Sequence, residues 1–544
     1  MVPDRFLGLD LGTQSLTAVV IDTVTGDLQQ TSINFDQAYP SYGTTDGALI
    51  SEDPTMVCVD PKMWVEALDD ILGSLARKGL TSNIRGIAVS GQQHGTVYLN
   101  EAAAPCLQGL DPSCPMIDQI SGIFSRPTSP IWMDSSTHAE CQEITAALGG
   151  DAKVAEITGS IATERFPGPQ IRKYWKNDPS GYKQTSHIAL VSSFITSLLI
   201  GKMAPLDCGD GFGTNLADIR TGRWSTEALE ATAPDLCRLL PKLIREDDLA
   251  GHVSDYLVRR YAFSPDTEVV IGTGDNPSSL AGLGLLGEPA TKAISLGTSD
   301  TYFGYLPRLL ISERTEGHIF GAADGGYMLL LCFKNGSLAR QAIKDRYGLS
   351  WNEFSDILLK TAPGNNGRIM LPYIMPEITP LVLKPHVFRF GGLEESDVTA
   401  NVRAVSEGQI MAMAHHSRVF GKKPDTILVT AGASENLGLL QTIADVFDVE
   451  AQSFEVKDSA ALGAAIRAAR WCLNKRGNSR SWRALTELFT TQRQSLVARP
   501  RKDAVRVYRA EGGLLDVYAA CEGFGLGIGR KPDKEIARFK EFFR

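Results

Sequence analysis

The sequence has no block of basic residues, and its 54 lysines and arginines are outnumbered by 63 aspartates and glutamates, for a formal net charge of -9. A protein that holds nucleic acid or an anionic membrane by electrostatics needs the opposite balance. The longest fairly apolar run, at 188–200, is shorter than the roughly 20 residues that span a bilayer. The composition therefore predicts neither a nucleic-acid partner nor a membrane segment.

Cysteine pairs are also lacking. The nine cysteines are scattered, odd in number and form no Cys-x-x-Cys motif, which argues against a disulfide framework and a structural zinc site. The first residues contain no basic segment followed by an apolar core, so no signal peptide is indicated. We expect a cytoplasmic protein with reduced thiols.

Two common nucleotide-binding motifs are missing. No Gly-x-x-x-x-Gly-Lys-[Ser/Thr] sequence occurs, which argues against a P-loop enzyme. The run "GLGLLG" at 282–287 has the glycine spacing of a dinucleotide site, but it follows a helical segment and is broken by Pro289. Because that motif requires a strand and then a helix, a nicotinamide dehydrogenase is disfavoured.

What is present is an alternation of short apolar runs with helical patterns, which predicts an α/β fold. Helices are expected at 62–78 and, with an amphipathic pattern, at 403–420. Strands are expected in "RFLGLDLG", "LTAVVID", "IRGIAVSG", "EVVIGTG", "KAISLGTS", "GYMLLLCF" and "DTILVTAG".

The chain of 544 residues is long enough for two large domains. "LDLGTQS" near residue 10 and "ISLGTSD" near residue 297 both place Leu-Gly-Thr between two strands, which indicates two related halves. A Gly- and Pro-rich interruption suggests a boundary near residue 290. We therefore predict domains at 1–289 and 290–475, with an extension of unknown role at 476–544.

The two Leu-Gly-Thr turns suit phosphate, because glycine allows close approach and the backbone N–H groups and hydroxyl can face an anion. Asp10 lies beside the first turn and could hold Mg²⁺. Asp275 follows an apolar strand and precedes a helix, where a carboxylate can take the proton of an attacking hydroxyl. The structural alternatives are ordinary hairpin glycines, an edge-strand acid at Asp10 and a helix N-cap at Asp275.

A family resemblance rests on "LDLGTQS", "SGQQHG", "WMDSST", "TGDNPSSLAG", "SLGTSDT", "GHIF", "LCFKNGSL" and "GASENLGLLQTIADVF". Their order and spacing over residues 5–475 resemble the FGGY carbohydrate kinases, whose two actin-like, ribonuclease-H-like domains surround a central cleft. "ERFPGPQIRK" and "LVSSFITSLLIG" are most similar to the eukaryotic xylulose kinases within that family. The resemblance implies ATP-dependent phosphorylation of D-xylulose to D-xylulose 5-phosphate, with Mg²⁺ as cofactor.

The resemblance also implies site residues. His94, Arg165, Asp275 and Asn276 match positions that bind the sugar, with Asp275 as the general base and Asp10 as the metal ligand. The implied nucleotide-binding residues are Thr13, Gly297, Thr298, Ser299, Trp351, Gly432, Ala433 and Asn436. Many relatives have Gly-Gly where this chain has Ala431-Gly432.

Two alternative functions stay open at this point: a kinase of another ketose or polyol such as ribulose or L-xylulose, and a non-catalytic actin-like sugar sensor. The oligomeric state is also open, as either a monomer or a homodimer. The presence of Asp275 favours an enzyme over a sensor, since a sensor needs no base. His138, His415 and His416 are assigned structural roles.

Overall fold

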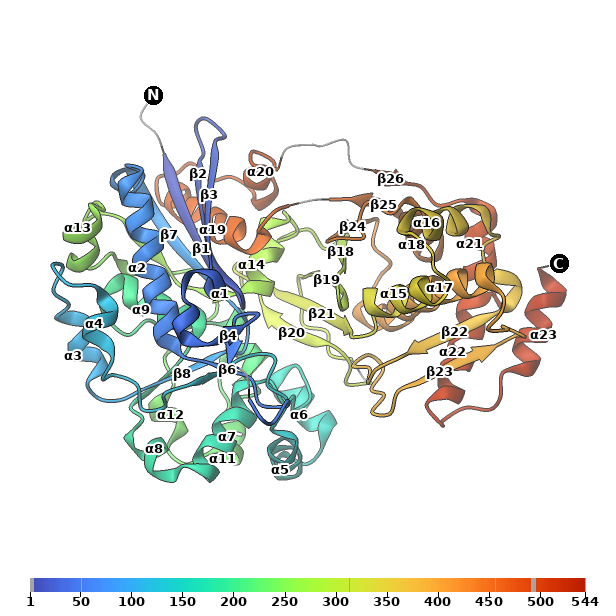
Figure 1. The fold of residues 1–544 in the computed structure, drawn as a ribbon, viewed down its shortest axis with the longest axis horizontal. Helices are drawn as coiled ribbons and strands as arrows, with labels where there is room; N and C mark the ends of the chain where they lie inside the picture. The colour runs from blue at the N-terminus through green and yellow to red at the C-terminus, as the bar shows by residue number, and fades with distance from the viewer. Residues whose placement is uncertain (1–3, 50, 313, 455, 491–495, 544) are drawn as a thin grey trace.

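The computed structural model describes residues 4–49, 51–312, 314–454, 456–490 and 496–543, and these fold around two large β-sheets. In Figure 1 the sheets lie in two halves, with the amino-terminal blue and green elements on the left and most of the yellow, orange and red elements on the right. Each predicted strand is present, with "EVVIGTG" divided between two short strands. The predicted α/β class is therefore confirmed.

The first sheet is centred on β1 (Arg5–Leu11), which pairs in parallel with β7 (Ile84–Gly91) and antiparallel with β2 (Ser15–Asp22). Asp10 is therefore on an interior strand, and the alternative that it is an edge-strand acid is wrong. The strand order is β15 (Leu249–His252), β16 (Glu268–Val270), β7, β1, β2 and β3 (Leu28–Asn34), with β17 (Thr273–Gly274) also paired to β7.

Helices cover both faces of this sheet. Leu7, Leu9 and Leu11 of β1 join the core formed with α2 (Pro61–Arg77) and α9 (Val191–Ile200). The opposite face packs against α14 (Asp275–Gly282) and α19 (Ser459–Lys475). At Gly8 a Cβ would lie 2.0 Å from the carbonyl oxygen of Ala461, so glycine is needed for α19 to lie this close to the strand. Strand periodicity puts Asp10 on the same face as Gly8.

The second sheet repeats this design. β18 (Thr291–Leu296) forms a hairpin with β19 (Asp300–Leu306) and pairs in parallel with β24 (Thr426–Thr430), as β1 does with β2 and β7. The internal repeat predicted from the two Leu-Gly-Thr segments is confirmed in these strands. The order is β20 (His318–Gly321), β21 (Tyr327–Phe333), β19, β18, β24, β25 (Glu450–Ser453) and β26 (Val497–Ala498).

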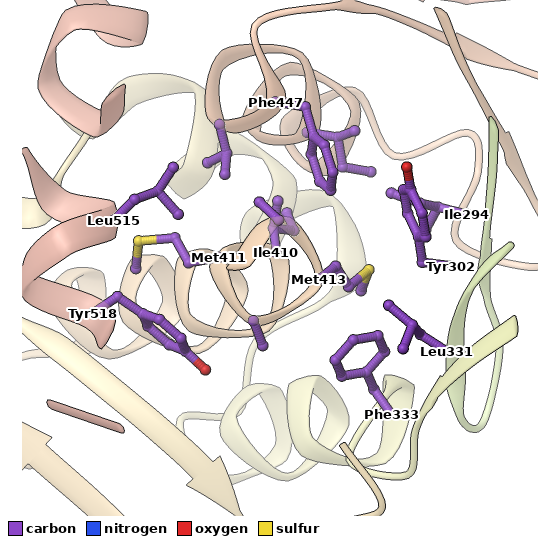
Figure 2. Close-up of a cluster of buried hydrophobic side chains, with 14 of the residues drawn as sticks. Ile294, Tyr302, Leu331, Phe333, Ile410, Met411, Met413, Phe447, Leu515 and Tyr518 are labelled. Atoms are coloured by element: carbon purple, nitrogen blue, oxygen red, sulfur yellow. The ribbon is translucent and has the colours of Figure 1, made fainter. Parts of the chain in front are cut away.

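A buried helix, α17 (Val398–His416), runs through the core of the second half. A helix was predicted at 403–420 and is found at Val398–His416, but the predicted amphipathic pattern is wrong. Arg403 and Glu407 are each 1 % exposed and form an ion pair inside the core. Figure 2 shows Met413 directed toward Leu331, and Met411 directed toward Leu515. The helix is thus enclosed from the sheet side and from the side of the carboxy-terminal helices.

Those carboxy-terminal helices complete the core of the second half. α21 (Lys502–Arg509), α22 (Leu514–Gly525) and α23 (Asp533–Phe542) contribute buried side chains to the same cluster as the sheet. In contrast, α19 and α20 (Trp482–Thr486) pack with α14. The division at residues 289 and 475 stays a prediction about folding units, and the packing crosses it.

Further helices are α5 (His138–Leu148), α7 (Pro167–Asn177), α10 (Cys208–Gly211), α15 (Ser337–Arg346), α16 (Trp351–Lys360) and α18 (Leu437–Phe447). Among the described residues, no helix combines the length and apolar character needed to cross a membrane.

Candidate active site

Two carboxylates lie at the carboxyl ends of neighbouring strands in the first sheet. The parallel register pairs Asp10 with Ser90, and pairs Ser90 with Thr273, two residues before Asp275. The Ser90 hydroxyl donates a 2.6 Å hydrogen bond to Oδ1 of Asp10. The sheet thus brings Asp10 and Asp275 to one edge, although they are far apart in the chain.

Both carboxyls hold their protons more tightly than usual. Burial, with the negative charges of Asp275 and Asp458, raises the pKa of Asp10 to about 7, against the lowering effect of the Ser90 bond. Burial raises the pKa of Asp275 to about 6, although backbone N–H groups of Asn276 and Gln93 favour its charged form. Carboxylates in this state accept a proton or a cation more readily than exposed ones.

Asp275 begins α14 but does not cap it. Gly274 occupies the N-cap position, and no side chain caps the helix, so the N-cap alternative is wrong. The Asn276 amide donates to Oδ1 of Asp275 at 2.9 Å and to Oε1 of Gln93 at 3.1 Å. Asp275 is therefore not the N-cap residue, and its carboxylate lies beside a second polar side chain, that of Asn276.

Gln93 was not predicted as a site residue. It is buried, and its amide donates to the carbonyl oxygen of Gly209 in α10 at 2.9 Å. It therefore ties Asn276 to α10. The signal available in the sequence was two adjacent glutamines within "SGQQHG", a polar pair directly after a buried strand.

His94 adopts a left-handed backbone, with φ of 72°. Its ring stacks on Phe166 at 4.2 Å between centroids, and its Nδ1 lies 2.8 Å from the carbonyl oxygen of Gly213. Because a carbonyl only accepts, Nδ1 carries the hydrogen and Nε2 is left as an acceptor. Burial and the charge of Arg165 lower the pKa of His94 well below its ordinary value, so the ring is neutral.

Arg165 is half-buried and precedes Phe166 in the chain. Its charge acts on His94 and also on His318 of β20. The structure therefore brings His94 and Arg165 together, beside Gln93 and the Asp275–Asn276 pair.

A buried ion pair lies directly after the turn at Gly297–Ser299, because Asp300 follows Ser299 and binds Arg340. Arg340 of α15 donates to both carboxylate oxygens of Asp300, at 2.6 and 2.9 Å. The backbone N–H of Ser337 donates to the carbonyl oxygen of Gly297 at 3.0 Å. Bidentate pairs of this kind fix orientation, so the turn is tied to the start of α15.

Three further nucleotide-binding candidates, Gly432, Ala433 and Asn436, follow β24 at the same edge of the second sheet. Parallel pairing of β18 with β24 aligns Ser295 with Thr430, which places the turn at 297–299 beside the turn that contains Gly432 and Ala433. Gly432 is exposed, and a Cβ added there would meet no atom within 4 Å. Asn436 caps α18 by accepting from the Leu439 N–H at 3.0 Å.

Trp351 begins α16, and its side chain is 44 % exposed. The hydroxyl of Ser355 in α16 accepts a bond from the Gly438 N–H in α18, at 3.3 Å. Trp351 therefore stands on a helix packed directly against the helix that follows Gly432 and Ala433. This contact brings the helix that carries Trp351 next to the helix that follows the nucleotide-binding candidates Gly432 and Ala433.

Thr13 has a partner that the sequence did not predict. The indole N–H of Trp132 donates to the Thr13 hydroxyl at 2.8 Å. Among the described residues, no hydrogen bond or ion pair joins the turn at Gly12–Thr13 to the turn at Gly297–Ser299. Their convergence on one nucleotide stays a prediction.

Two sheets of matching design, each with a glycine turn after its first strand, define a two-domain actin-like architecture. Solved structures agree: a ligand-bound xylulose kinase from Lactobacillus acidophilus aligns with a TM-score of 0.78 and 21% identity over 96% of this chain and 98% of its own. A glycerol kinase with ADP from Plasmodium falciparum aligns with a TM-score of 0.74 and 15% identity, over 92% and 94%. These likenesses establish the fold.

The chain belongs to the FGGY family of carbohydrate kinases. The family's N-terminal domain model matches residues 5–115 and 128–282, and its C-terminal domain model matches residues 293–472. The xylulose kinase of Mus musculus is 40% identical over 97% of this chain and 95% of its own length. Xylulose kinase 2 of Arabidopsis thaliana is 41% identical over 88% and 89%. The resemblance inferred from the motifs is confirmed.

Proposed function

We propose that this protein transfers the γ-phosphoryl group of ATP to D-xylulose and forms D-xylulose 5-phosphate. Near full-length similarity to mouse and plant xylulose kinases supports the sugar. The observation that carries the chemistry is Asp275, a carboxylate with a raised pKa at the start of α14, next to Asp10 and Asn276.

Asp275 is the proposed general base. It takes the proton of the C5 hydroxyl as that oxygen attacks the γ-phosphorus; the new O–P bond forms while the bond from the γ-phosphorus to the β,γ-bridging oxygen breaks and ADP leaves. With a pKa of about 6, the carboxylate is mostly ionised at neutral pH yet more basic than an exposed aspartate. A base acts best when its pKa lies near the working pH.

His94, Arg165 and Asn276 are the proposed sugar ligands. Neutral His94 offers Nε2 as an acceptor for a hydroxyl, because Nδ1 is engaged by Gly213. Arg165 supplies several fixed donors to sugar oxygens. The Asn276 amide is oriented by Gln93 and by Asp275 itself, which keeps it beside the reacting hydroxyl.

For the nucleotide, we propose that the turns carrying Thr13 and Gly297–Ser299 hold phosphate oxygens through backbone N–H groups and hydroxyls. Trp351, Gly432, Ala433 and Asn436 are proposed to border the adenosine. Ala431 departs from the glycine found in many relatives and has a positive φ of 68°. Such a backbone conformation costs about 1 kcal/mol or more for a non-glycine residue.

Asp10 fits a hard divalent cation such as Mg²⁺. Ser90 binds Oδ1, and Oδ2 makes no hydrogen bond with any described residue; Mg²⁺ takes one or two carboxylates together with water and substrate phosphates. When bound, the cation would neutralise charge on the transferring phosphoryl group. We further propose a cytoplasmic location and a monomer or homodimer.

A coupled ADP-release assay over ketoses and polyols tests this function. We expect kcat/KM for D-xylulose to exceed that for glycerol by about 10³-fold or more, because hydrogen-bonded pockets reject ligands that leave their groups unpaired. Discrimination against D-ribulose should be smaller, since one mispaired hydroxyl costs about 1–3 kcal/mol. Comparable rates on glycerol and D-xylulose would contradict the proposal. ATP binding without transfer to any sugar would favour the sensor.

A further inference from the structure

His318, in the second sheet, contacts Ser160 and Phe166 of the first half, which flank the predicted sugar ligand Arg165 in the sequence. It begins β20, an edge strand of the second sheet. Its ring centroid lies 5.2 Å from that of Phe166, and its Nδ1 lies 3.4 Å from the hydroxyl of Ser160. Both contacts are with the amino-terminal half of the chain.

Phe166 links two histidines. The His94 ring stacks on Phe166, and the His318 ring contacts the same phenyl ring at an angle of 47°. Phe320 lies 6.2 Å from each imidazole. His318 is therefore part of one aromatic cluster with a residue already proposed to bind the sugar.

The ring of His318 is uncharged at neutral pH. Burial and the neighbouring charge of Arg165 lower its pKa to about 3. A neutral imidazole has one donor and one acceptor nitrogen, and either can engage a hydroxyl. Because it carries no charge, His318 can lie near Arg165 without repelling it.

One ring nitrogen of His318 is available. Nδ1 faces Ser160, whereas Nε2 makes no hydrogen bond with any described residue and is not among the buried atoms that lack a partner. The residue is half-buried. Nε2 therefore remains open to a ligand, and its hydrogen-bonding role is set by the Ser160 hydroxyl, which can donate or accept.

A series of side-chain contacts connects Asp275 to His318. Asp275 bonds Asn276, Asn276 bonds Gln93, and the adjacent His94 stacks on Phe166, which in turn meets His318. Asp275 stands at one end of this series and His318 at the other. His318 is therefore on the side of His94 and Phe166 that is away from Asp275 in this series of contacts.

We propose that His318 is a sugar-binding residue supplied by the second half of the chain, with Nε2 hydrogen-bonded to the C1 hydroxyl of the ketose. This inference rests on the proposed function. The sugar site is then complete only when β20 lies against the Phe166 segment, and a ketose that lacks the C1 hydroxyl loses one specific contact.

The test measures binding of D-xylulose and 1-deoxy-D-xylulose to the full-length protein by calorimetry, without nucleotide. His318→Phe keeps an aromatic ring against Phe166 and Phe320 but removes both nitrogens, and His318→Gln returns a polar group. His386→Phe is the matched control, because His386 is exposed on β23 (His386–Phe390) and contacts Phe388. Thermal midpoints of all variants monitor folding.

We expect His318→Phe to weaken D-xylulose binding by about 5-fold or more, as for loss of one hydrogen bond, with the thermal midpoint unchanged. Its affinity for 1-deoxy-D-xylulose should stay at the wild-type value, so that discrimination between the two sugars disappears. His318→Gln should recover part of the affinity, and the control should bind like wild type.

Wild-type affinity of His318→Phe for D-xylulose would overturn the inference, as would an equal loss for both sugars, which would indicate packing alone. Phosphorylation of D-xylulose by the wild-type protein is measured first. If wild type neither binds nor phosphorylates D-xylulose, the proposed function fails. If it does both and only the His318 result is negative, this inference fails alone.

Discussion

Replacing Asp275 with asparagine should lower activity and raise stability in the same protein. Asparagine keeps an oxygen that can accept from the Asn276 amide, which donates to Asp275 at 2.9 Å, but it cannot take a proton. A positioned base contributes about 10²- to 10⁴-fold, so kcat should fall by at least about 10²-fold. Binding of ATP should change little, because the nucleotide candidates lie on the other sheet and at the β1–β2 turn.

The gain in stability follows from the sign of the pKa shift. In the folded protein the pKa of Asp275 is raised from 3.8 to about 6. The stability associated with the protonated form is therefore fully present below pH 3.8 and is lost as pH rises through about 6. Asparagine does not titrate and avoids this loss. A shift of about two units corresponds to at most about 3 kcal/mol at pH 7.

Urea unfolding of wild type and Asp275→Asn at pH 5 and pH 7.5, with the ADP-release assay on the same preparations, measures both effects. The midpoint for the variant should be higher at pH 7.5, and the difference should shrink by about half at pH 5. Near-normal turnover would refute the base assignment. A variant less stable than wild type at pH 7.5 would refute the electrostatic reasoning.

Three further substitutions test other parts of the site. Asp10→Ala should weaken binding of MgATP while sugar affinity is largely retained; calorimetry that showed the reverse would move Asp10 to the sugar site. His94→Ala should reduce phosphorylation of D-xylulose but leave the slow sugar-independent hydrolysis of ATP nearly unchanged, and equal loss of both rates would mean that His94 supports the fold. At Gly463 a Cβ would lie 1.8 Å from the carbonyl oxygen of Ser278, so Gly463→Ala should displace α14 and lower the free energy of unfolding by about 1–3 kcal/mol. Gly122→Ala is the control, because a Cβ there would meet no atom within 4 Å. Equal urea midpoints for the two variants would contradict close packing of α14 against α19.

The sequence predicts well what depends on neighbouring residues. The two hairpins around Gly12 and Gly297 follow from local alternation and turn chemistry, and they are found as expected. Asp10 looked anomalous between two leucines, and strand alternation explains it: the leucines enter one core while Asp10 faces α14 on the other side.

Features that depend on distant partners were not predicted. The charge of Glu407 suggested a solvent-facing side of α17, yet Glu407 forms an ion pair with Arg403 inside the core. Trp132 meets Thr13 across more than a hundred residues, and His318 meets Phe166 across the two halves. Hydrophobic periodicity contains no information about such pairings, because it reports only which face of an element is buried.

The position of α19 has a consequence for synthesis on the ribosome. The strands of the first sheet are made by residue 274, but the helix that covers Gly8 starts at Ser459. At roughly 5–20 residues per second, that face waits about 10–40 seconds for its cover. A nascent chain in this interval exposes the apolar surface around Phe6 and Ala88, which α19 later buries. Chaperone capture should therefore peak after the first sheet emerges and end once α19 has left the exit tunnel.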